Sequence, residues 1–284
     1  MDKSEIRIIN PIDISNTVAK LFGEANINMQ GDIVSALKKA HKEEINLLPK
    51  EALSLILENA EIAKQKEIPI CQDTGMAIVY IEIGNKVVVD GDIYQAVNAG
   101  IAKATEKYYL RASIVADPLN RINTNNNSPA ITYIKITEGD KLRITVMPKG
   151  FGSENMSFLK MFLPTASKVD IMKYVVECVK QAGANPCPPI IVGVGIGGTS
   201  DYAMFLAKKS LLRGTNIPSI HPYYANMEKE LLNKINETNI GVQGFGGKHT
   251  ALSVNIKPYP THIAGLPVAV TIGCHVCRHA SMEI

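Results

Sequence analysis

NPCPPIIVGVGIGGTSD (residues 185–201) places a proline-flanked cysteine directly before an apolar run and a glycine-rich turn. Prolines on both sides of Cys187 fix φ and remove amide donors, so this segment is stiff and extended. Residues 190–194 have the composition of a short buried strand, and residues 202–213 have helical periodicity. The stretch therefore predicts a strand that leads through a glycine turn into a helix.

The rest of the chain alternates between the two kinds of pattern. Helical periodicity covers residues 16–66, with breaks at Asn26, Gly31 and Pro49, and returns at 92–109 and 171–182, where Gly183 is a stop signal. Strand patterns occupy 77–89, read as a hairpin around Gly84-Asn85, and also 130–136 and 142–147. Helices come first and strands later, which predicts an α+β fold with a largely antiparallel sheet. We expect one domain over residues 1–284, helical to about residue 66 and mixed α/β from about residue 67.

Composition excludes several classes of protein. The 284 residues are 46% hydrophobic and carry a net charge of +3, which is too small and too evenly spread for a nucleic-acid-binding face. No apolar run approaches the ~18 residues of a membrane span, and the first residues lack the pattern of a secretory signal. We therefore expect a cytoplasmic protein that binds neither nucleic acid nor membrane.

The chain has five cysteines, an odd number that argues against a disulfide framework and favours reduced thiols available for metal binding or chemistry. Cys71, Cys187 and Cys274 stand in three distinct motifs, too far apart in sequence for a local metal loop. Only a folded domain could bring these three thiolates to one point. The pair Cys274 and Cys277, with His275 between them, also resembles half a zinc site or a redox pair, and ordinary buried thiols remain the alternative.

The glycines of residues 193–198 fit the dinucleotide-binding fingerprint. A nicotinamide site also needs an acidic residue about 20 positions later, yet no Asp or Glu lies between Asp201 and Glu228. This absence disfavours a nicotinamide-dependent oxidoreductase. The turn could instead offer backbone N–H groups to an anion or a cluster sulfide, or be a simple strand-to-helix connection.

Four motifs together resemble those of class I fumarate hydratases and L-tartrate dehydratases: residues 71–75, 149–155, 185–201 and 266–275. The resemblance implies a hydro-lyase with a [4Fe-4S] cluster held by Cys71, Cys187 and Cys274. It leaves Cys178 and Cys277 without a ligand role. Three thiolates, rather than four, would leave one iron open to substrate.

The same resemblance implies the α subunit of a two-subunit enzyme. A separate β subunit would complete the active site, and a dimer of αβ units is expected. The expected reaction is the reversible hydration of fumarate to (S)-malate, so a small dicarboxylate is the substrate. An L-tartrate dehydratase α subunit is the alternative within the family, and a non-catalytic, metal-binding structural subunit is the alternative outside it.

Site residues follow from the positions that match the family motifs. The resemblance implies acid–base work or orientation for Asp73, and substrate binding with proton management for His262. It implies that Arg111 clamps a substrate carboxylate, a task that suits a bidentate guanidinium. Weaker candidates for hydrogen bonds to the diacid are Gln72, Gly152 and Asn155, and His275 is placed to tune the cluster from beside a ligand.

Overall fold

The computed structural model describes residues 6–284 and divides the chain into two compact units. Unit 1 comprises the described residues up to Met29, together with residues 60–150 and 278–284. Unit 2 comprises residues 30–59 and 151–277. Residues 1–5, on which the expected lack of a secretory signal partly rests, lie outside the described part. The prediction of one catalytic domain over the whole chain stays a prediction.

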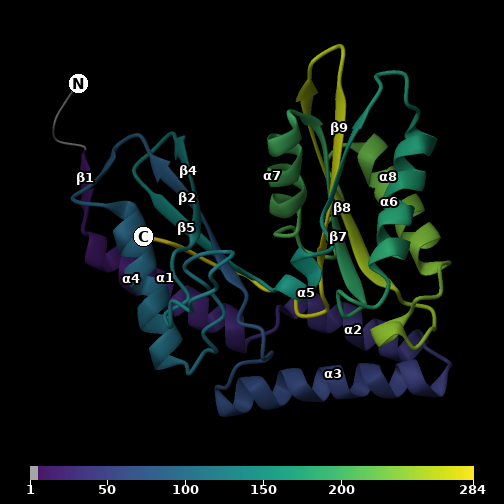
Figure 1. Cartoon of the computed structure of the whole chain (residues 1–284), viewed down its shortest axis with the longest axis horizontal. Coiled ribbons are helices and arrows are strands. Elements are labelled where there is room, and N and C mark those ends of the chain that lie inside the picture. The colour runs from purple at the N-terminus through teal and green to yellow at the C-terminus, as the bar shows by residue number, and fades with distance from the viewer. Residues whose placement is uncertain (1–5) are drawn as a thin grey trace. The chain divides into compact units, whose positions relative to one another are not determined.

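The region predicted to be helical before the first cysteine forms, within the described residues, α1 (Pro11–Ile27), α2 (Gly31–Glu43) and α3 (Leu47–Lys66) (Figure 1). The side chain of Asn10 caps α1 by accepting from the Ile12 N–H, and Pro11 occupies the first turn. Pro49 does not break the helical region, because it lies in the first turn of α3, where an amide proton has no helical partner.

Unit 1 is built on a four-stranded sheet. Its order is β10 (Ala280–Glu283), β5 (Leu142–Lys149), β2 (Met76–Gly84) and β4 (Ile131–Thr137), with β2 and β4 parallel and the other pairs antiparallel. Helices α1 and α4 (Ile93–Lys107) pack with the inward side chains of β2 and β5 in one core (Figure 1). The strands predicted at 130–136 and 142–147 are therefore present.

The predicted hairpin around Gly84-Asn85 is wrong. Strand β3 (Val87–Val89) leaves the sheet and pairs in parallel with β1 (Arg7–Ile9). The turn is tied elsewhere, because the Gly84 N–H donates to Lys141 O and the Asn85 N–H donates to Thr137 O. These bonds hold the turn against the β4–β5 connection, so the chain cannot fold back on β2.

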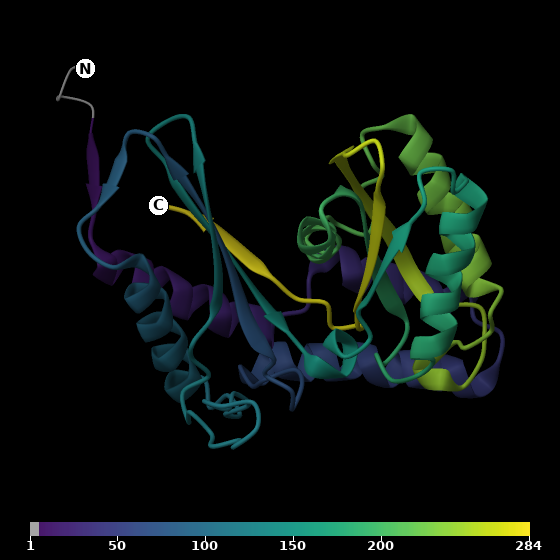
Figure 2. The ribbon, with the colours of Figure 1, turned by 45° about the horizontal axis from the view of Figure 1, so that its top comes forward.

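Unit 2 contains a second four-stranded sheet, in the order β6 (Phe158–Phe162), β9 (Leu266–Gly273), β7 (Ile190–Gly198) and β8 (Ala251–Thr261). Strands β7 and β8 are parallel, whereas β9 is antiparallel to β6 and β7. Helices α6 (Lys168–Ala182) and α8 (Pro222–Asn236) cover one face, and α7 (Ser200–Ser210) covers the other (Figures 1 and 2). The unit also contains α2, the part of α3 up to Asn59, the short α5 (Phe151–Glu154) and η2 (Val242–Gly244).

The glycines of β7 explain the dinucleotide-like motif. Val192 and Val194 point into the core with α6 and α8, so the alternate residues Gly193 and Gly195 face α7. A Cβ on Gly195 would lie 2.0 Å from the Ala203 carbonyl oxygen, and one on Gly193 would lie 2.3 Å from that of Ala207. These glycines let α7 approach the sheet, and the strand continues through them to Gly198, beyond its predicted end.

The fold class is confirmed: both sheets mix parallel and antiparallel pairs, with antiparallel pairs in the majority. The helix predicted at 171–182 is confirmed and starts earlier, at Lys168, where Ser167 and Asp170 form a capping box. Within residues 6–284, no helix is long and apolar enough to cross a bilayer.

Replacing Gly195 with alanine tests the packing of α7. We expect Gly195→Ala to lower the free energy of unfolding by about 1–3 kcal/mol, because backbone or helix must shift to admit the Cβ. Gly265→Ala is the matched control, since nothing lies within 4 Å of its Cβ position. Denaturant unfolding of both variants measures the effect, and equal midpoints would contradict the packing role.

Candidate functional site: two cysteine loops and a polar network

Cys187 and Cys274 lie at the same end of the unit 2 sheet. Cys187 precedes β7, and Cys274 follows β9 directly. The two strands are antiparallel with Ile191 opposite Gly273, so the start of one strand meets the end of the other. The sheet register therefore brings these two cysteine loops together, although they are far apart in sequence.

Hydrogen bonds join the two loops. His275, next to Cys274, approaches the Cys187 carbonyl oxygen with its ring Nδ1 at 2.8 Å and its backbone N at 3.4 Å. Gln243, from η2, donates to the Pro188 carbonyl oxygen through its backbone N at 2.8 Å and its Nε2 at 2.7 Å. The carbonyl oxygens of Cys187 and Pro188 are thus both bonded to residues remote in sequence.

Helix α5 brings one of the predicted substrate contacts to this end. A Cβ on Gly152 would lie 3.4 Å from the Asn185 carbonyl oxygen, so α5 packs beside the Cys187 segment. Asn155 follows α5, is exposed, and has its backbone N–H bonded to Phe151 O. The family-like motif at residues 149–155 consists of the end of β5 followed by this short helix.

The Cys71 loop belongs to unit 1 and runs into β2. Its left-handed Gly75, with φ of +75°, packs directly on the backbone of Lys149 and Gly150. The Gly75 N–H donates to Asp73 Oδ1 at 2.9 Å. A Cβ on Gly150 would lie 3.0 Å from Asp73 Oδ2. One carboxylate oxygen is therefore held by the loop itself, and the other lies over the glycine that follows β5.

Arg111 is fixed next to this loop by its backbone. Helix α4 ends at Lys107, earlier than predicted, so Arg111 lies in the connection that follows. Its carbonyl oxygen accepts from Thr74 Oγ1 at 2.8 Å and from Asn127 Nδ2 at 3.0 Å, and both donors are buried residues. The Arg111 backbone is thus held beside Thr74, the neighbour in sequence of the predicted residue Asp73, while Arg111 itself is exposed.

Arg278 holds the same loop, and sequence reasoning missed it. Only 5% of this residue is exposed, and its guanidinium donates to the carbonyl oxygens of Asp73 and, at 3.2 Å, Thr74. Sequence reasoning also missed Gln243. Neither residue stands in a recognisable local motif, and the position of Arg278 directly after Cys277 was the only available signal.

His262 lies at the other end of the unit 2 sheet. It sits in the turn between β8 and β9, where its Nδ1 accepts from the Ala264 N–H at 3.1 Å. The whole of β9 separates it from Cys274, a length of roughly 25 Å at about 3.4 Å per residue. The structure therefore does not bring His262 to the Cys187–Cys274 end of its own unit.

The glycine turn before α7 is also at the far end of β7 from Cys187. It therefore does not face a group bound beside Cys187.

Exposure separates the five cysteines into two groups. Cys187 is exposed, and Cys71 and Cys274 are half-buried, whereas Cys178 and Cys277 are buried. Burial in the core raises the pKa of the Cys178 thiol to about 11, and Tyr174 is hydrogen-bonded to it. The three accessible thiols are those in the predicted cluster motifs.

Over residues 6–284 no three His, Cys, Asp or Glu side chains converge on one metal position. Unit 2 carries two of the predicted ligands, and unit 1 carries the third.

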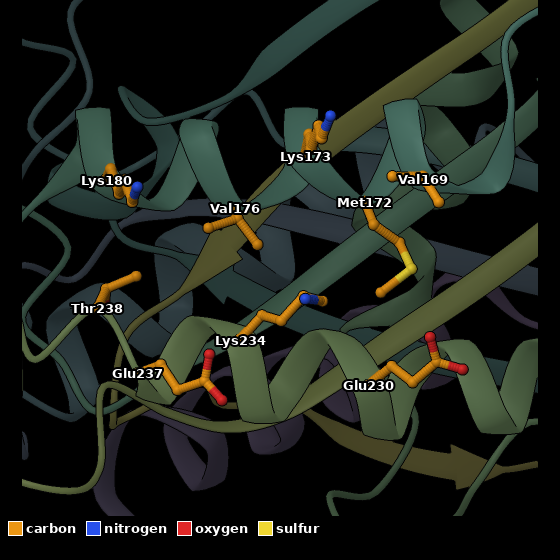
Figure 3. Close-up of a pocket in the computed structure, with 9 residues that line it drawn as sticks. All are labelled: Val169, Met172, Lys173, Val176, Lys180, Glu230, Lys234, Glu237 and Thr238. Atoms are coloured by element: carbon orange, nitrogen blue, oxygen red, sulfur yellow. The ribbon is translucent and has the colours of Figure 1, made fainter.

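A separate groove of about 480 Å³ lies between α6 and α8 on the outside of unit 2 (Figure 3). Lysine and glutamate side chains line it together with apolar residues. None of the predicted site residues is among the lining residues, which are Val169, Met172, Lys173, Val176, Lys180, Glu230, Lys234, Glu237 and Thr238.

Thiol labelling tests the division of the cysteines. In the metal-free native chain at pH 8, we expect iodoacetamide to modify Cys71, Cys187 and Cys274 at least ~10-fold faster than Cys178, because only the thiolate reacts and burial suppresses it. Peptide mass spectrometry measures each rate. All five should react in denaturant, and fast native labelling of Cys178 would contradict its burial.

The comparisons with known proteins cover almost the whole chain. The family model described as Fumarate hydratase (Fumerase) matches residues 15–283. The protein named "Putative L(+)-tartrate dehydratase subunit alpha" of Methanocaldococcus jannaschii is 43% identical over 279 residues, which cover 95% of this chain and 97% of that one. The L(+)-tartrate dehydratase subunit alpha of Escherichia coli K12 is 27% identical over 275 residues, 95% of this chain and 90% of its own. The chain is therefore a member of the fumarate hydratase (Fumerase) family of hydro-lyases.

Proposed function

We propose that this chain is the α subunit of a two-subunit [4Fe-4S] hydro-lyase that adds water to fumarate to form (S)-malate, and removes it in reverse. The observation that carries the proposal is the family match over residues 15–283. The relatives' names support the subunit assignment, since both are called subunit alpha. A β subunit would then supply the rest of the active site.

L(+)-tartrate is the second candidate substrate. Both relatives are named tartrate dehydratase subunits, which favours tartrate as strongly as the family description favours fumarate. Malate and tartrate are both four-carbon 2-hydroxy diacids, and they differ by one hydroxyl group. The residues proposed below for the shared carboxylates serve either substrate.

Cys71, Cys187 and Cys274 are the proposed cluster ligands. Their accessibility fits that role, because a thiol must be reachable to bind iron, and Cys178 and Cys277 are buried. When bound, the cluster would supply an open iron that acts as a Lewis acid on the substrate hydroxyl. The fixed backbones around Cys187 and Cys71 would present their thiols at set positions.

Asp73 and Arg111 are the proposed substrate residues of unit 1. The Gly75 N–H fixes one carboxylate oxygen of Asp73, which orients the group for accepting a proton from the carbon next to the hydroxyl-bearing one. Thr74 and Asn127 fix the Arg111 backbone. Its exposed guanidinium can then bind a substrate carboxylate through two parallel bonds. Gln72, Gly152 and Asn155 remain proposed hydrogen-bonding partners of the diacid.

His262 needs a different arrangement. Because it lies at the opposite end of the sheet from Cys187 and Cys274, it cannot contact a substrate bound beside those cysteines of its own unit 2. Its proposed role in substrate binding and proton management therefore requires a second copy of the chain. This requirement agrees with the expected dimer of αβ units.

Activity in the presence of the β subunit tests the proposed function. We expect the anaerobically prepared αβ complex to dehydrate (S)-malate or L(+)-tartrate, and either chain alone to be inactive. A ratio of kcat/KM values for the two substrates identifies the preferred one. A complex that holds its cluster but turns over neither substrate would contradict the proposal and favour the structural, non-catalytic alternative.

Arg111→Lys tests the carboxylate clamp. We expect KM to rise on the order of 10-fold or more with cluster content unchanged, because lysine keeps the charge but loses the paired geometry. Arg121→Lys is the matched control, as Arg121 is an exposed arginine of the same connection. An unchanged KM for Arg111→Lys would remove this residue from the substrate site.

A further inference from the structure

Gln243 lies between the two cysteine loops of unit 2, where it is hydrogen-bonded to the Cys187 loop and touches the ring of His275 in the Cys274 loop. Its Nε2 is 2.7 Å from the Pro188 carbonyl oxygen and 3.2 Å from Nδ1 of His275. Its backbone N–H donates to the same Pro188 oxygen at 2.8 Å.

The chemistry of the partners fixes the protons in this cluster. A carbonyl oxygen only accepts, so the 2.8 Å contact with Cys187 O requires the proton of His275 to be on Nδ1. The Pro188 carbonyl oxygen is likewise an acceptor. The side-chain atom of Gln243 that lies 2.7 Å from it must therefore be the amide nitrogen and not the amide oxygen. Gln243 and His275 therefore each donate to one of two consecutive carbonyls, and the polypeptide at Cys187 is held on both sides.

The backbone conformations at this point are costly. Gln243 and Cys187 both have φ of +53°, a left-handed conformation that costs non-glycine residues about 1–3 kcal/mol. The loop around Gln243 is firmly anchored. Val242 is fully buried, the Gly246 N–H donates to Ile240 O, and the Lys248 N–H donates to Glu44 Oε2 at 2.8 Å. Strained backbone that is held this firmly is characteristic of positions where exact geometry matters for function.

We propose that Gln243 is a positioning residue that presets the Cys187 and Cys274 thiols for the cluster, acting through its hydrogen bonds to Pro188 and its packing contact with the His275 ring. This inference rests on the proposed cluster function and assigns a role to a residue outside the cysteine motifs. Loss of a comparable outer partner of a metal ligand lowers metal affinity or activity by about 10–100-fold. We expect an effect of the same size here.

Two variants of Gln243 separate hydrogen bonding from shape. Gln243→Met keeps the length of the side chain and removes the donor. Gln243→Glu keeps the shape but sets a carboxylate oxygen against the Pro188 oxygen, so it should be at least as damaging. Both retain the backbone N–H bond and the left-handed φ. Gln181→Met is the matched control, since Gln181 is an exposed glutamine on α6 in the same unit.

The full chain, reconstituted anaerobically with iron and sulfide, is mixed with an iron chelator, and the half-life of iron release is measured. We expect both Gln243 variants to lose iron at least ~10-fold faster than wild type, with Gln181→Met unchanged. In the metal-free chain, both Gln243 variants should also change the alkylation rate of Cys187 while leaving that of Cys71 unchanged. The second readout does not depend on the cluster.

The outcomes distinguish the two proposals. A wild-type chain that takes up no iron defeats the proposed function, and with it the role of Gln243 toward a cluster. A wild-type chain that holds iron, with Gln243→Met and Gln243→Glu releasing it at the wild-type rate, defeats the role of Gln243 alone. Circular dichroism and the unfolding midpoint confirm that each variant is folded before either rate is compared.

Discussion

The antiparallel register of β7 and β9 is the constraint on which the unit 2 site depends. Ile191 stands opposite Gly273, so the proline-flanked Cys187 and the turn that carries Cys274 meet at one end of the sheet. Strand β7 is buried between helices over residues 190–197. Valines of β7 fill the core on one side, and Gly193 and Gly195 admit α7 on the other.

The Cys71 loop and the Cys187 loop are held in the same way. Each loop is held by a polar side chain from a distant part of the sequence, which binds backbone carbonyls rather than the thiol. Arg278 binds the carbonyls of Asp73 and Thr74, and Gln243 binds that of Pro188. Backbone anchoring of this kind fixes the position from which a thiol or carboxylate side chain extends. The conformation of each loop is therefore stabilised by a side chain that is remote in sequence.

Local patterns predicted much of the fold. The capping box at Ser167 and the left-handed Gly183 bound α6 close to its predicted limits, because helix ends are determined by neighbouring residues. The hairpin prediction at Gly84-Asn85 failed because bonds to Lys141 and Thr137, which no local pattern reveals, hold the turn. Gln243 and Arg278 were missed on the same grounds: their partners are remote in sequence. The position of His262 also depends on strand register, which the sequence does not show.

Iron and acid-labile sulfide per chain, measured after anaerobic reconstitution of the wild type and of five single cysteine-to-serine variants, test the central claim most directly. The account predicts about four of each in the wild type, retained in Cys178→Ser and Cys277→Ser and lost in Cys71→Ser, Cys187→Ser and Cys274→Ser. Full retention in any of the last three variants, or zinc in place of iron in the wild type, would contradict it.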